Sequence, residues 1–174
     1  MRDRILDSFL ERQREEGLAL SRASDLFELV AIDPPVPTKY LVRFHSRGMV
    51  RSPEGEIVEA ERFDVGIRFG PDHLRRVTPY ELVTWLAPGT VFHPNIRPPY
   101  ICIGRVTPGI GLVDLIYQVF EVIGYVKVTM REDDALCLEA CAWSRENKAR
   151  FPIEARPLKR RALRLETREP EATR

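Results

Sequence analysis

The chain has 174 residues, a length that suits one domain with one hydrophobic core. Hydrophobic residues make up 44% of the sequence and charged residues 30%, which excludes a fibrous or wholly disordered chain. The formal net charge is only +1, so the chain lacks the basic excess typical of proteins that bind nucleic acid, and we expect no such partner.

Two further features indicate where the protein works. The first five residues are charged and amphipathic, and no later stretch approaches the ~18 apolar residues of a membrane span. We therefore expect a cytoplasmic protein that does not enter a membrane. The three cysteines, Cys102, Cys137 and Cys141, are an odd number that does not suit a secreted disulfide framework, so we expect free thiols.

The first half of the chain predicts one helix followed by antiparallel strands. Apolar residues recur at helical spacing over residues 5–20, and the proline-rich residues 33–37 then mark a connection. Residues 40–45 and 62–69 alternate with a period of two, which is typical of strands. Between them, residues 52–55 (Ser-Pro-Glu-Gly) fit a type I turn, so we expect an antiparallel meander.

The second half predicts two short strands and then two helices. The strand candidates are residues 82–86 and 90–92. Residues 110–123 are too rich in apolar side chains for a surface helix and predict a buried central helix. Residues 135–151 have the mixed pattern of an amphipathic C-terminal helix.

These elements predict an α+β fold with helices against one sheet. We expect a single folded domain over residues 1–155. Residues 156–174 are charged and poor in large apolar side chains, so we expect a disordered tail there.

The most unusual local sequence lies over residues 91–103, where Cys102 follows Asn95 by seven residues across a proline-rich loop. A thiolate can accept an activated acyl group as a thioester, and attack of an amine on that thioester creates an oxyanion. A nearby side-chain amide, such as that of Asn95, can stabilise the oxyanion. This chemistry requires neither a metal nor an organic cofactor.

This segment resembles the active-site region of the ubiquitin-conjugating enzymes. Residues 93–96 (His-Pro-Asn-Ile) and 101–103 (Ile-Cys-Ile) match the family in type and order. Residues 111–124 resemble its central helix, and residues 133–136 (Asp-Asp-Ala-Leu) resemble its Asp-Asp-Pro-Leu gate segment. The resemblance covers most of residues 1–151.

The resemblance implies a ubiquitin-conjugating-like fold and a role for each matched residue. Cys102 would carry the C-terminus of a ubiquitin-like modifier as a thioester, and Asn95 would serve as oxyanion donor or loop brace. Asp134 would orient or deprotonate the incoming lysine amine. His93 and Pro94 would be structural parts of the motif.

The resemblance also implies protein partners. These are the modifier, an activating enzyme that docks on the N-terminal helix, and a target protein that accepts the modifier. Residues 97–100 fill a shorter gap than is usual in the family, and Ala135 replaces the gate proline. Both differences indicate a divergent, bacterial branch, some of whose members belong to antiviral operons.

Alternatives remain beside this interpretation. A non-catalytic binding module needs only the same fold and a surface groove. A cysteine hydrolase needs a Cys–His pair, and all three histidines (His45, His73 and His93) precede Cys102 in the chain.

Three other motifs have structural interpretations. Asp133 and Asp134 could cap a helix that begins at Ala135. Cys137 and Cys141 lie four residues apart, which favours core packing on one helix face over a metal site. The glycines of residues 104–111 lack the lysine of a phosphate-binding loop, so we expect no nucleotide cofactor.

Overall fold

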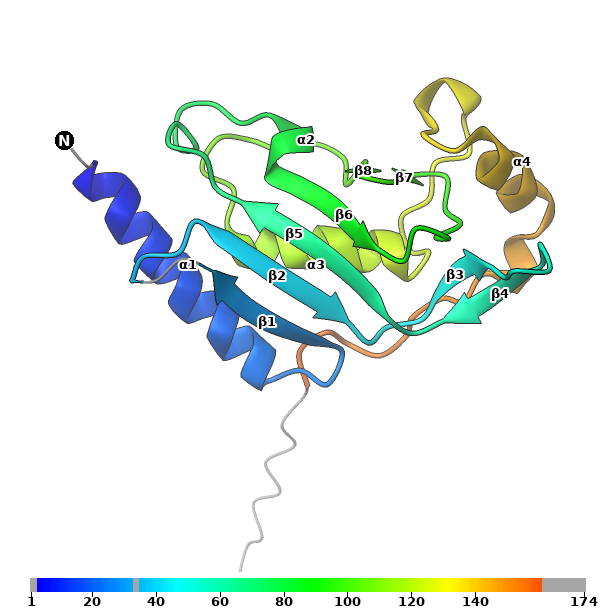
Figure 1. The fold of residues 1–174 in the computed structure, drawn as a ribbon, viewed down its shortest axis with the longest axis horizontal. Helices are drawn as coiled ribbons and strands as arrows, with labels where there is room; N and C mark the ends of the chain where they lie inside the picture. The colour runs from blue at the N-terminus through cyan, green and yellow to red at the C-terminus, as the bar shows by residue number, and fades with distance from the viewer. Residues whose placement is uncertain (1–2, 33–34, 161–174) are drawn as a thin grey trace, which may run out of the picture.

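The computed structural model describes residues 3–32 and 35–160, and it has an N-terminal helix, a four-stranded antiparallel sheet and further helices (Figure 1). The α+β class predicted from the sequence is therefore confirmed. In chain order the elements are α1 (Arg4–Arg22), β1 (Phe27–Ile32), β2 (Lys39–Phe44), β3 (Gly48–Arg51), β4 (Ile57–Ala60), β5 (Phe63–Arg68), α2 (Pro79–Leu82), β6 (Val83–Ala87), β7 (Ile96–Arg97), β8 (Tyr100–Ile101), α3 (Leu112–Ile123), α4 (Leu138–Glu146) and the 3₁₀ turns η1 (Glu132–Asp134) and η2 (Lys148–Arg150).

The main sheet has the order β1-β2-β5-β6, and all its neighbouring strands are antiparallel. The two strands predicted from period-two alternation are confirmed as β2 and β5, which pair directly with Val42 opposite Val65. The predicted turn closes a separate hairpin between β3 and β4, where the Gly55 N–H donates to the Ser52 carbonyl at 3.0 Å. In Figure 1 this hairpin extends beyond the ends of β2 and β5.

One strand candidate is wrong. Residues 90–92 form no strand, and their only ladder contact in the described chain is an isolated bridge between Val91 and Val50. Pro88 and Pro94 bracket this short run, and neither can donate a backbone hydrogen bond, so a regular ladder cannot extend. The other candidate, residues 82–86, corresponds to β6.

The predicted central helix is confirmed as α3, which lies between Gly111 and Gly124 and crosses behind the sheet in Figure 1. Seven of its residues are buried in the main core: Leu112, Leu115, Ile116, Val119, Phe120, Val122 and Ile123. The helix α1 contacts both β1 and α3. The core therefore lies between the sheet and these two helices.

The last predicted helix begins three residues late. The helix α4 starts at Leu138 with Cys137 as its N-cap, and it ends at Glu146 before the separate turn η2. Asp133 and Asp134 belong to η1, so the prediction that they cap a helix from Ala135 is wrong.

Most of the predicted tail, residues 161–174, lies outside the described residues. Within the described part, Leu158 is 2% exposed and belongs to the main core, and the Arg160 N–H donates to the Ala23 carbonyl at 2.9 Å. The packed chain thus continues past residue 155.

Among residues 3–32 and 35–160, no helix is both long and apolar enough to cross a membrane.

Gln13 links the two helices of the core. Its side chain is 3% exposed, and its Oε1 accepts the Leu112 N–H at 2.7 Å. Gly111, the N-cap residue of α3, has no side chain to do this. Gln13 therefore caps α3 from another helix and satisfies a buried backbone donor.

We expect Gln13→Leu to lower the free energy of unfolding by about 1–3 kcal/mol, because it leaves the Leu112 N–H buried without an acceptor. Urea denaturation followed by circular dichroism measures this change. The exposed Glu15, on the same helix, provides the control variant Glu15→Gln, which we expect to stay within about 0.5 kcal/mol of the wild type. Equal stability of the Leu variant and the wild type would contradict the capping role.

Candidate active site

A short hairpin presents Cys102 to solvent. The strands β7 and β8 pair through Ile96 and Ile101, and Cys102 follows β8 directly. Ile101 and Ile103 are 6% and 2% exposed, whereas Cys102 between them is exposed. The alternation of an extended chain turns the two isoleucines into the core and leaves the thiol outside. Cys102 therefore lies on the surface of the protein.

Asn95 is bonded to Cys102 through both its backbone and its side chain. The Cys102 N–H donates to the Asn95 carbonyl at 2.8 Å, and the Asn95 Nδ2 donates to the Cys102 carbonyl at 3.2 Å. On its other side, the Asn95 Oδ1 accepts the Thr129 N–H at 2.9 Å. Asn95 itself is only 5% exposed, so its side chain is largely removed from water. The side chain thus joins residues 101–104, here called the cysteine loop, to the segment after α3, residues 125–131.

His93 holds the turn that carries Asn95. Its Nδ1 accepts the Asn95 N–H at 3.0 Å, and its ring packs edge-on against Tyr125 with centroids 4.3 Å apart. Burial lowers the pKa of His93 to about 3, so the imidazole is neutral at physiological pH. Its Nε2 is buried without a hydrogen-bond partner in the described structure. His93 therefore has a structural position and no access to a reacting proton.

The other two histidines lie in separate surroundings. The His73 Nε2 is bonded to the Ile110 carbonyl at 2.8 Å, and the His45 Nε2 lies 3.0 Å from the Glu28 carboxylate. Within the described residues, no histidine forms a hydrogen bond with Cys102. The geometry therefore offers no Cys–His pair for the hydrolase alternative.

Pro94, the middle residue of the His-Pro-Asn motif, anchors the end of the gate segment (residues 133–136). Its carbonyl accepts the Leu136 N–H at 2.9 Å and the Cys137 N–H at 3.1 Å. These two bonds hold the chain extended at Ala135, whose ψ is 133°. This explains why the helix begins only at Leu138.

Asp134 lies close to this anchored segment in sequence, but in the described part of the chain it forms no hydrogen bond with Cys102 or Asn95. Its exposed carboxylate forms an ion pair with the Arg131 Nε at 3.4 Å. Arg131 also hydrogen-bonds Asp133 and holds the pKa of that carboxyl below its usual range. The described structure thus brings together Cys102 and Asn95, and leaves Asp134 on the surface.

The two remaining cysteines differ in their positions. Cys141 is completely buried within α4, and its Sγ lies 3.8 Å from the Thr129 carbonyl, which agrees with the predicted core packing. Cys137 is half-buried at the N-cap and is not part of the helix. In residues 3–32 and 35–160, no group of three or more His, Cys, Asp or Glu side chains is arranged to hold a metal ion.

The sequence interpretation missed Lys127 and Thr129, which line the cysteine loop. The Lys127 Nζ donates to the Ile103 carbonyl at 2.5 Å. Lys127 lies two residues before Thr129, whose N–H donates to the Asn95 Oδ1. Thr129 acts through its backbone N–H, which every residue except proline has, so its residue type carries no signal. For Lys127, a single charge between Val126 and Val128 was the only available clue.

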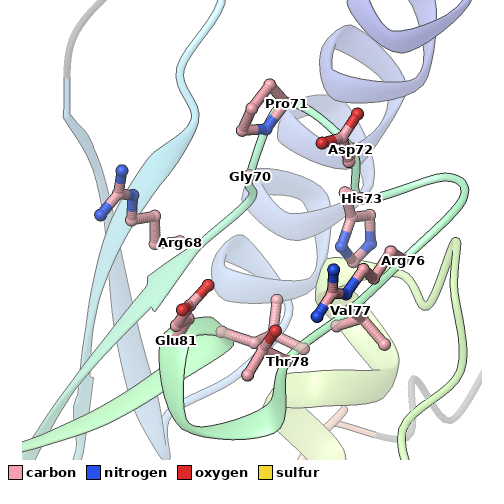
Figure 2. Close-up of a pocket in the computed structure, with 10 residues that line it drawn as sticks. Arg68, Gly70, Pro71, Asp72, His73, Arg76, Val77, Thr78 and Glu81 are labelled. Carbon is pink, nitrogen blue, oxygen red and sulfur yellow. The ribbon is translucent and has the colours of Figure 1, made fainter.

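A separate surface pocket of about 580 Å³ lies between the loop after β5 and α2. Figure 2 shows Arg68 and Arg76 on opposite sides of it, with Glu81 between them in this view. Asp72 completes a balanced set of two cationic and two anionic side chains. None of the residues predicted for catalysis lines this pocket.

Comparison with known proteins adds no assignment to this geometry. No family model matches the chain, and no curated protein sequence matches it either. The site residues themselves therefore carry the functional interpretation.

The two ends of the Asn95 amide can be tested separately. We expect Asn95→Ala to increase the hydrogen-exchange rate of the Thr129 amide by about tenfold or more, because the acceptor for that N–H is lost. Asn95→Asp retains an oxygen for Thr129 and replaces the donor to the Cys102 carbonyl with a carboxylate oxygen, so Thr129 should remain protected. Exchange measured by nuclear magnetic resonance distinguishes the two variants, and equal protection of Thr129 in both would contradict the bridging geometry.

Proposed function

We propose that the chain is a conjugating enzyme of the ubiquitin-conjugating type. It carries a ubiquitin-like modifier as a thioester on Cys102 and transfers it to an amine of a target protein. The observation that carries this proposal is the exposed Cys102 thiol whose own peptide groups are bonded by Asn95. The order of helix, antiparallel sheet, central helix and later helix supports it as well.

The chemistry follows from the accessible thiol. The Cys102 thiolate attacks the thioester carbonyl of the charged activating enzyme, a new C–S bond forms, and the activating enzyme's thiolate leaves. A target amine then attacks the new thioester, the C–S bond breaks, and Cys102 leaves as the thiolate while the nitrogen loses a proton. Both steps pass through a tetrahedral oxyanion.

Asn95 suits the role of oxyanion donor. A side-chain amide has two N–H groups, and one of them donates to the Cys102 carbonyl. The second is proposed to donate to the oxyanion that forms at Cys102. Because Asn95 is buried and fixed through Thr129, this donor is preorganised, and such a donor lowers a reaction barrier by roughly 3–4 kcal/mol.

The proposed partners are proteins. The thiol lies on an exposed hairpin outside the pocket of Figure 2, and this suits a macromolecular acyl group better than a small substrate. The outer face of α1 exposes Arg4, Arg12 and Arg14, and we propose it as the docking face for an activating enzyme. Within this proposal the chain belongs to a bacterial conjugation system, and it acts in the cytoplasm.

We expect Cys102→Ala to abolish formation of a reducible adduct with the modifier. The assay combines ATP, the activating enzyme and ubiquitin-like proteins encoded near this chain, and gels with and without reductant detect the thioester. Cys102→Ser should form an adduct that resists reductant, because an oxyester replaces the thioester. The half-buried Cys137 provides the control Cys137→Ser, which should load normally.

Two outcomes would contradict the proposal. One is an adduct that persists in Cys102→Ala, which would place the acyl carrier elsewhere. The other is a wild-type chain that no modifier charges, which would favour the non-catalytic binding module.

Asp133 and Asp134 form a matched pair for testing the second step, because both interact with Arg131 and both are exposed. We expect Asp134→Asn to slow discharge of the thioester to free lysine by about tenfold or more, since an amide neither accepts a proton nor attracts an ammonium group. Asp133→Asn should stay within about twofold of the wild type. Single-turnover discharge measures both rates, and equal slowing by the two variants would indicate a general loss of negative charge.

A further inference from the structure

Lys127 occupies an unusual position beneath the cysteine loop. It lies in the segment between α3 and η1, and its Nζ donates to the carbonyl of Ile103, the residue after Cys102. The side chain is half-buried. A half-buried ammonium group loses hydration, and this loss has to be offset by local interactions.

The loop is shaped around this ammonium group. Gly104 has a φ of +98°, a conformation that favours glycine. A Cβ atom at Gly104 would lie 2.4 Å from the Lys127 Nζ. Residue 104 therefore leaves free the space that the lysine head group fills.

Two successive carbonyls of the cysteine loop are held by side chains. Asn95 donates to the Cys102 carbonyl and Lys127 donates to the Ile103 carbonyl. The segment of Lys127 and Thr129 thus holds the loop at two points, once directly and once through Asn95. The carbonyl groups of Cys102 and of the next residue are therefore both held by side-chain hydrogen bonds.

The charge of Lys127 is not neutralised by a neighbour. Within residues 3–32 and 35–160, no carboxylate forms an ion pair with it, and its hydrogen bond goes to an uncharged carbonyl. A positive charge held in a partly desolvated loop acts more strongly on nearby anions than one in bulk water. Among residues 101–105 (Ile-Cys-Ile-Gly-Arg), Cys102 is the side chain that can become an anion, and it directly precedes Ile103 in the chain.

We propose that Lys127 is a positioning residue for Cys102, and that it fixes the cysteine loop and supplies a positive charge that favours attack by the thiolate. Its part in acyl transfer rests on the function proposed above. The effect on the thiol itself does not require a modifier and can be measured with small reagents.

The test compares alkylation of Cys102 at pH 7 and low salt by neutral iodoacetamide and by anionic iodoacetate. The full chain is used as wild type, Lys127→Met, Lys127→Gln and Lys127→Arg. The exposed Lys148 provides the matched control Lys148→Met. Trypsin releases Cys102 in the peptide of residues 77–105, because Pro98 protects Arg97, and mass spectrometry therefore follows this thiol apart from Cys137 and Cys141.

We expect the Met and Gln variants to slow alkylation of Cys102 by about threefold or more, with a larger loss for iodoacetate than for iodoacetamide. The Arg variant retains the charge, and Lys148→Met lies elsewhere, so both should stay within about twofold of the wild type. Circular dichroism identifies any variant that fails to fold, and the Gln and Arg variants then decide the outcome between them.

Three results would overturn the proposed role of the Lys127 charge. Equal rates for the wild type and the Gln variant would leave the charge without a role. Equal slowing by Arg and Met would show that only the shape of lysine matters. A uniform loss with both reagents in the Gln variant would indicate a distorted loop instead of a missing charge.

These outcomes separate the inference from the proposed function. A wild-type chain that shows the expected alkylation pattern but accepts no modifier would contradict the conjugating activity alone. A chain that accepts the modifier while Lys127→Gln alkylates normally would contradict the role of Lys127 alone.

Discussion

The site depends on one side-chain amide that joins two segments far apart in sequence. Asn95 binds the Cys102 carbonyl with its nitrogen and the Thr129 N–H with its oxygen. Neither contact is a regular secondary-structure bond, so without this amide the cysteine loop and the segment after α3 would keep the Lys127 bond to the Ile103 carbonyl but lose the link at Cys102 itself. Because Asn95 is buried, replacing the amide with an apolar side chain would leave polar backbone groups without partners.

The surroundings of Asn95 keep this amide in place. The neutral His93 accepts the Asn95 backbone N–H, and Pro94 accepts two N–H groups from the gate segment. Beneath them, a second apolar cluster forms around Met49, Phe92, Tyr125 and Ala140. This cluster packs the hairpin of β3 and β4, the motif and α4 against one another. The three residues of the His-Pro-Asn motif thus hold one another's turn and bond to the cysteine loop, the segment after α3 and the chain before α4.

Local patterns predicted the regular elements well. The period-two alternation identified β2 and β5, and the density of apolar residues identified α3. Both patterns arise because the buried positions of a strand or helix are occupied by apolar residues at the period of that element. The same approach failed at residues 90–92 and at Ala135. There the backbone conformation is set by bonds to Met49 and Pro94, which are distant in sequence and leave no local periodicity.

The site residues divide in the same way. Cys102 and Asn95 were found because their types and spacing carry chemical meaning, and their proximity is a property of the short hairpin between them. Lys127 and Gln13 were missed as functional or capping groups because each acts on a backbone atom far along the chain. Every residue has a backbone carbonyl, and every residue except proline has a backbone N–H, so the sequence does not show which backbone group such a side chain contacts. Only the folded structure shows the contact.

Asn95 and Asp134 differ in how firmly the structure holds them. In the proposed reaction Asn95 stabilises the oxyanion best if it does not move when the charge forms, and its hydrogen bonds to main-chain atoms, rather than a deep pocket, hold it in place. The thiol can therefore remain on an exposed hairpin, open to large partners, while the groups behind it stay ordered. Among residues 3–32 and 35–160, Asp134 has no comparable anchor, since its carboxylate pairs there with the exposed Arg131. In the proposed function, a partner that engages Arg131 would release the Asp134 carboxylate for the acceptor amine, so that the substrate itself would complete the catalytic arrangement.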